Sequence, residues 1–260
     1  MNTFTATLFV LSVGASLLRA QDDDGFERIL SVGLHGGYGA ASHSASFAKL
    51  PNVPDCCPEY TGGSGGGLIM GIDVGLPVAP QIDVTLRLGY QSFGGTMTTD
   101  EPITVRVEND ARQTALRHTL ETTVSTIIIE PGIEYRINNI GLMGGLRLGL
   151  ASSGTYSTQE AFADPSIPWT YRGGASTYLP SSGSLTNVAG LQLGLMLGAR
   201  YHLKIASTLQ IVPEVSYAPA LSNNVQDIDW STSAIRFGLG ISYQLTRISR
   251  LGTPILPGDR

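Results

Sequence analysis

The stretch from Leu191 to Leu203 alternates in character with a period of two residues over thirteen positions. Successive side chains of a β-strand point to opposite faces, so this pattern predicts a long strand with one apolar face and one face of glycine, polar and charged residues. In a soluble barrel or sandwich the apolar face would point inward. In a transmembrane barrel it would point to lipid, and the polar face would line the interior. The apolar face consists of Leu191, Leu193, Leu195, Leu197, Ala199, Tyr201 and Leu203.

The same alternation returns in seven further segments, which together predict eight strands in one domain. Short connections at 77–80, 138–139 and 204–207 alternate with long ones at about 42–65, 94–118, 153–188 and 221–232. Short turns on one rim and long loops on the other are typical of outer-membrane barrels. We therefore expect an all-β, eight-stranded antiparallel up-and-down transmembrane β-barrel over 29–247, with long extracellular loops. The seven further segments are 29–41, 66–76, 82–93, 127–137, 140–150, 209–217 and 236–245.

Six tyrosines lie on the apolar faces of their strands and near the strand ends. This placement predicts two aromatic girdles at the membrane interfaces, whereas a soluble barrel of the lipocalin kind would leave it unexplained. If the first strand runs outward, the outer girdle contains Tyr38, Tyr90 and Tyr217, and the inner girdle contains Tyr135, Tyr201 and Tyr243.

Composition and the chain ends are consistent with export. Charged residues make up 14% of the chain and the net charge is −5, which excludes a basic nucleic-acid surface. The apolar run Leu8–Leu18, followed by Ala20, predicts a secretory signal peptide over 1–20. We expect a periplasmic N-terminal segment over 21–28 and a short periplasmic tail over 248–260.

Two stretches carry a family resemblance. The segment Arg236–Tyr243 resembles the signal that bacterial outer-membrane barrels present for assembly, with Arg236, Gly238, Ile241 and Tyr243 at its marked positions. The region 26–247 resembles the small porin-like barrels of the OmpA and OmpX type. This resemblance implies the outer membrane of a Gram-negative cell envelope, with outer-membrane lipid and the barrel-assembly machinery as partners.

The Cys56–Tyr60 stretch resembles a feature of OmpA-family barrels from Bacteroidota-related phyla. Residues 248–260 are too few for the peptidoglycan-binding domain of OmpA, so the resemblance does not extend to anchoring the cell wall.

The polar parity places charged residues inside the predicted barrel. We expect the four acids and four bases to form ion pairs with one another, because buried charge is tolerated only when it is paired and hydrogen-bonded. We expect Arg87, Glu130, Arg147 and Glu214 at the centre, Arg236 nearer the outer rim, and glycines such as Gly194 and Gly238 making room for arginines. A packed polar core and a gate whose pairs exchange partners both fit the pattern. The eight residues are Asp73, Arg87, Glu130, Glu134, Arg147, Arg200, Glu214 and Arg236.

The function predicted from these features is structural or surface-interacting, with an extracellular or envelope protein as a possible partner at the loops. Loop aromatics such as Trp230 could anchor a partner or pack loops together. A narrow gated channel for ions or small solutes is the first alternative, although the interior of eight strands holds only side chains. A lipid-modifying enzyme built on Ser42-His43-Ser44 is the second, but no acid is placed to orient His43. We expect no enzymatic activity, no metal and no cofactor.

Two local expectations concern the outer loops. Alternation resumes after Gly94-Gly95 and again before Thr126, which predicts a protruding hairpin with its tip at 108–110 and strand edges that a partner could extend. Cys56 and Cys57 are adjacent in an exported chain, so we expect them oxidised, either to each other in a strained ring or between molecules.

Overall fold

The computed structural model describes residues 26–51, 58–168, 170–171 and 174–248, and these residues form ten β-strands. None of the described segments is a helix long and apolar enough to cross a membrane. The strands are β1 (Phe26–Phe47), β2 (Tyr60–Ala79), β3 (Ile82–Val107), β4 (Asp110–Ile137), β5 (Ile140–Phe162), β6 (Thr177–Ser184), β7 (Gln192–Tyr201), β8 (Leu203–Lys204), β9 (Leu209–Ala218) and β10 (Asp229–Ile248).

Eight of the described strands close into a ring of antiparallel neighbours. The order is β10-β1-β2-β3-β4-β5-β7-β9, and β9 pairs back with β10. β8 continues β7 in the same register along β9, because Arg200 lies opposite Glu214 and Leu203 opposite Ile211. The predicted strand ending at Leu203 is therefore β7 and β8 with a break at His202. β6 stands outside the ring, paired with the far part of β5.

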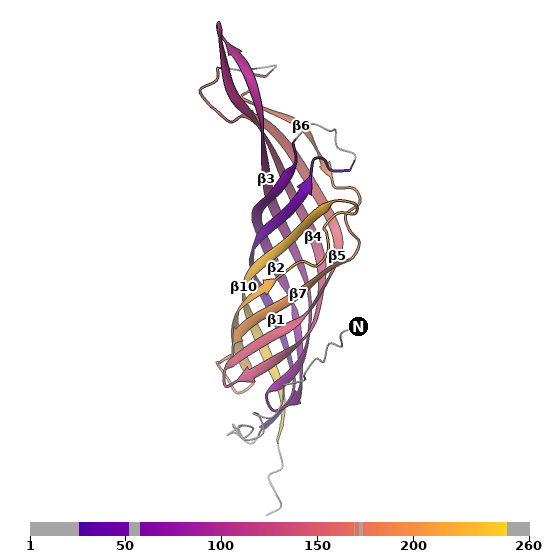
Figure 1. Ribbon diagram of the computed structural model, residues 1–260. Coiled ribbons are helices and arrows are strands. Elements are labelled where there is room, and N and C mark those ends of the chain that lie inside the picture. Colours follow the sequence, from indigo (N-terminus) through magenta and orange to yellow (C-terminus); the bar gives the residue numbers. More distant parts are fainter. Residues whose placement is uncertain (1–25, 52–57, 169, 172–173, 249–260) are drawn as a thin grey trace, which may run out of the picture.

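The two ends of the barrel differ (Figure 1). Tight connections join β2 to β3, β4 to β5 and β8 to β9 at one end, here called the turn end. At the other, the hairpin end, β3 and β4 rise above the rest of the ring. Their pairing runs unbroken from Ile82–Tyr135 to Val107–Asp110, and Glu108 in the connecting turn has a φ of 57°. The predicted protruding hairpin is confirmed.

Large apolar side chains cover the outside of the barrel wall. Leu34 is 66% exposed, Leu68 62% and Leu239 58%. So many exposed apolar side chains would be costly in water, and as a continuous band around a closed barrel they match the ~25 Å apolar belt of a membrane-spanning barrel. The ring and its apolar outer face agree with the fold expected from the alternation.

Toward the hairpin end β1 and β3 keep their two faces but exchange the chemistry of these faces. On β1, Ser42 and Ser44 point outward, while Ala45 and Phe47 are buried inside. On β3, Thr96 and Thr98 point outward and Met97 is fully buried. Polar-out and apolar-in is the pattern of a protein in water, so the exchange marks the level at which a membrane-spanning wall would leave the lipid. Serines stand at or near this level on six strands, namely Ser42, Ser64, Ser92, Ser125, Ser152 and Ser233.

The strands extend well into regions expected as long loops. β1 continues to Phe47, β2 begins at Tyr60 and β5 reaches Phe162. β5 does so through a register shift opposite Ser125 and Thr126, which leaves Ser152 without a partner on β4. A bulge of this kind reverses the parity of the strand beyond it, so the inward residues of β5 change from odd numbers such as Arg147 to even ones such as Thr158.

Candidate functional site

The interior of the lipid-level barrel is a network of ion pairs centred on Arg87. Its Nε donates to Asp73 Oδ1 at 2.6 Å and its Nη2 donates to Glu214 Oε1 at 2.7 Å. Asp73 also contacts His35 Nδ1, with 3.1 Å between the atoms. β3 brings Arg87 opposite Asp73 on β2 and opposite Glu130 on β4, so the antiparallel register creates the cluster. With Arg87 only 2% exposed, this charge depends on its carboxylate partners.

Glu130 is the hub that connects three arginines. Arg236 Nη1 donates to Glu130 Oε1 at 2.6 Å, while Arg87 Nη1 and Arg147 Nε each lie 3.9 Å from a carboxylate oxygen of Glu130. Arg236 was expected nearer the outer rim than this cluster; its side chain contacts Ser216 and reaches the carboxylate of Glu130. The depth of a Cα along a strand does not fix the position of a guanidinium several bonds away.

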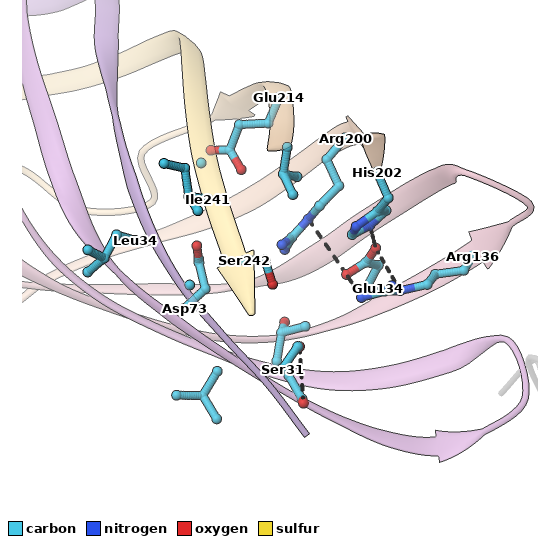
Figure 2. A pocket seen from close by; sticks show the side chains of 16 residues that line it. Ser31, Leu34, Asp73, Glu134, Arg136, Arg200, His202, Glu214, Ile241 and Ser242 are labelled. Carbon is cyan, nitrogen blue, oxygen red and sulfur yellow. Dashed lines mark hydrogen bonds and ion pairs between the residues drawn. The ribbon is translucent and has the colours of Figure 1, made fainter. Parts of the chain in front are cut away.

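A second cluster lies nearer the turn end, around Glu134 (Figure 2). His202 Nε2 lies 2.6 Å from Glu134 Oε1, Arg136 Nε lies 3.1 Å from the same oxygen, and Arg200 Nε lies 3.6 Å from Oε2. Arg136 Nη2 also bridges to Asp83 Oδ2 at 2.8 Å. The ionic network therefore continues from the centre of the barrel toward its turn end.

Three members of this second cluster, Arg28, Asp83 and Arg136, were absent from the predicted set of charges. Asp83 accepts from Arg28 at 2.6 Å and from Arg136. Asp83 could have been found because it lies on the same face of its strand as Arg87. Arg136 could have been found because it lies on the same face of its strand as Glu134. With these additions the two ionic clusters contain five carboxylates and six arginines. The carboxylates are Asp73, Asp83, Glu130, Glu134 and Glu214, and the arginines are Arg28, Arg87, Arg136, Arg147, Arg200 and Arg236.

The hairpin end of the interior is filled by an apolar cluster, here called the outer core. Trp230 is completely buried in it, and its Nε1 donates to His43 Nδ1 at 3.1 Å. Trp230 therefore belongs to β10 and the interior, which corrects its assignment to an exposed loop. The outer core comprises Ala45, Phe47, Leu50, Tyr60, Met97, Leu120, Val124, Leu185, Val225, Ile228 and Trp230.

The serine and histidine of the proposed enzyme site point to opposite sides of the wall. His43 faces inward, 5% exposed, and contacts Trp230 and Thr232. Ser42 and Ser44 face outward because they flank His43 on the same strand. This tripeptide therefore cannot place a serine hydroxyl on its own histidine. In the described part of the chain, no three His, Cys, Asp or Glu residues are grouped to hold a metal ion.

The remaining predicted positions are distributed over the wall. In the assembly-signal segment, Ile241 and Tyr243 face outward while Arg236 faces inward. Gly194 borders Arg147, since a Cβ there would lie 3.7 Å from Nη1, and the three atoms nearest to a Cβ at Gly238 belong to Glu214. Cys56 and Cys57 lie outside the described residues. The six predicted girdle residues all face outward, at 39–52% exposure: Tyr38, Tyr90, Tyr135, Tyr201, Tyr217 and Tyr243.

A closed eight-stranded ring with an apolar outer band and an ionic interior defines the class, which is the outer-membrane β-barrel fold. No protein-family model matches the sequence, and no curated protein matches it. Solved structures do. Neisserial surface protein A is 12% identical with a TM-score of 0.34, covering 85% of this chain and 97% of that one. Ail of Yersinia pestis is 12% identical with a TM-score of 0.29, covering 84% and 99%.

One similar structure corrects an expectation. The outer membrane protease OmpT from Escherichia coli matches with a TM-score of 0.33 at 10% identity, covering 83% of this chain and 96% of that one. The expectation that this chain is not an enzyme is therefore withdrawn, because similar folds include a protease. The fold leaves enzymatic status undetermined.

Proposed function

We propose that this protein resides in an outer membrane, with its turn end in the periplasm and its hairpin end outside the cell. The apolar outer band, the tyrosines at its margins and the change to serine and threonine toward the hairpin end support this orientation. Residues 1–20 would direct export, and the segment from Arg236 to Tyr243 would be read by the barrel-assembly machinery. The eight-stranded ring supports the relation to OmpA and OmpX barrels. The narrower relation to Bacteroidota proteins rests on a stretch of which Cys56 and Cys57 are outside the described residues.

The proposed role is interaction with a partner at the cell surface, carried by the β3–β4 hairpin. Beyond the last pair between β2 and β3, Gly63–Met97, β3 continues for ten residues with no described strand on that side. Its backbone groups there are free to pair with another chain, which is how strand addition works. An ion pair braces this extension, since Arg117 donates two hydrogen bonds to Asp100 at 2.8 and 2.9 Å. A rigid strand edge far from the lipid is a suitable contact surface.

The closed interior weighs against the channel alternative. Ion pairs occupy the lipid level and the outer core occupies the hairpin end, so a solute would have to displace both. The strand number alone already limits the interior to side chains. The interior therefore supports a role for the outer surface more than a role in conduction.

Cross-linking in intact cells tests this function. A photoreactive residue at Asn109, the hairpin tip, should form a defined adduct that one at Lys204, at the turn end, does not. A variant lacking 103–107 and 110–114 preserves register, because it removes five residues from each paired strand and keeps the Glu108-Asn109 turn. It should still form the barrel while losing partner binding. Absence of any adduct at the tip would refute the surface role.

A further inference from the structure

We propose that the barrel holds a small monovalent anion of chloride size beside Arg147, between the ion-pair network and the outer core. The site is an internal cavity of about 20 Å³. This cavity is large enough to hold a water molecule or an ion of chloride size. The cavity is lined by polar groups including Gln91, Thr126, Arg147 and Gln192, and by Phe93 and Val124 on the apolar side.

Arg147 is the least compensated charge among the described interior residues. It is 5% exposed, and its nearest carboxylate contact is the 3.9 Å approach of Nε to Glu130 Oε1. That oxygen already accepts from Arg236 at 2.6 Å. Arg147 Nε has no hydrogen-bond partner within the described chain. A buried guanidinium without close compensation is costly, and an anion in the adjacent cavity would compensate it.

The charge balance of the interior points the same way. In the two ionic clusters around Arg87 and Glu134, six arginines face five carboxylates, so one positive charge remains there when every carboxylate is paired. The other five arginines each have a carboxylate oxygen within 3.6 Å, and Arg147 does not. One monovalent anion next to Arg147 would make the balance even.

The polar groups at the cavity suit an anion better than a cation. Gln192 Nε2 and Thr126 Oγ1 are buried donors without a partner in the described residues. Gln91 Oε1 is equally unpartnered, and reversing its amide would present Nε2 as a third donor. His43 Nδ1 accepts the hydrogen bond of Trp230 Nε1, so this ring nitrogen does not donate to the proposed anion. Arg147, Gln192, Thr126 and Gln91 together could surround one anion with hydrogen bonds.

Diffraction from crystals grown in bromide tests the proposal directly, since bromide replaces chloride and scatters anomalously. The proposal predicts an anomalous peak within hydrogen-bond distance of the Arg147 guanidinium. Electron density of a water molecule with no anomalous signal would overturn it. An anomalous peak only at the protein surface would mean an adventitious ion only, and would overturn it equally.

A stability titration provides the second measurement. At constant ionic strength, replacing gluconate by chloride should raise the Tm of the wild-type barrel in detergent saturably, because a ligand that binds the folded state stabilises it. The rise should disappear in Arg147→Gln and persist in Arg106→Gln, which removes an exposed hairpin arginine. Equal Tm in both salts for the wild type would contradict the site. If Arg147→Gln fails to fold, the bromide peak in the wild type still decides.

Discussion

Replacing Glu130 by alanine should strongly destabilise the barrel. Glu130 is 1% exposed and is approached by Arg87, Arg147 and Arg236, the last through a 2.6 Å hydrogen bond. Breaking a buried ion pair by removing one partner costs about 3–5 kcal/mol, because the other charge stays buried without compensation. Three arginines share this carboxylate, but Arg87 keeps Asp73 and Glu214, so we expect a loss within that range and no larger.

The measurement is the free energy of unfolding from urea titrations of the barrel in lipid vesicles. Glu121→Ala is the matched control, since Glu121 lies on the same strand but points outward and is exposed. The control should change the free energy of unfolding by less than about 0.5 kcal/mol. Glu130→Gln keeps the shape and removes only the charge, so it should fall between the two. A loss below about 1 kcal/mol for Glu130→Ala would refute the reasoning that these arginines depend on it.

Three further predictions concern Trp230, the Arg117–Asp100 pair and the two cysteines. Trp230→Ala should cost about 3–5 kcal/mol in the same assay, because the indole is completely buried in the outer core, whereas the exposed Tyr178→Ala should cost far less. Arg117 holds the pKa of the Asp100 carboxyl below its ordinary value, so this pair should stabilise the hairpin at neutral pH and be lost as the pH falls through the lowered pKa. Hydrogen exchange of hairpin amides should then no longer differ between wild type and Arg117→Gln at acid pH; a difference that persists would contradict the pairing. Cys56 and Cys57 should be oxidised, and a dimer band on non-reducing gels that reductant removes would rule out an exclusively internal bridge.

The part of the barrel with the apolar outer band can be predicted well from the sequence, because its outward residues are mostly apolar and its inward residues are mostly polar. Every strand in the lipid has an apolar outer face, so residues such as Leu88 and Leu239 reveal both the strand and its orientation. Opposite parity then identifies the interior charges, including Arg87 and Glu130. Their Cα register follows from the hairpins, but the partner of a long side chain such as Arg236 depends on the curvature of the whole ring.

The part of the strands toward the hairpin end is harder to predict, because there the outward residues are mostly polar and the inward residues are mostly apolar. From Ser42 to Phe47, serines alternate with buried residues, but here the apolar side points inward. A strand predicted from its lipid-facing apolar residues therefore ends before the real strand does. The same reversal places Trp230 in the outer core when its neighbours suggest a loop. The bulge at Ser152 adds a second obstacle, since it shifts parity within β5 at a position that the residue types do not mark.

The outward face of β3 should change from lipid to water between Leu88 and Thr98. Cysteine labelling in intact cells tests this change most directly. In a background with Cys56 and Cys57 replaced by serine, single cysteines would be introduced at Thr98, outward above the band, and at Leu88, outward within it. A membrane-impermeant maleimide should label the cysteine at 98 in intact cells and leave the one at 88 unlabelled until the protein is denatured. Labelling at 88 in intact cells, or at 98 only after lysis, would contradict the proposed membrane level and orientation.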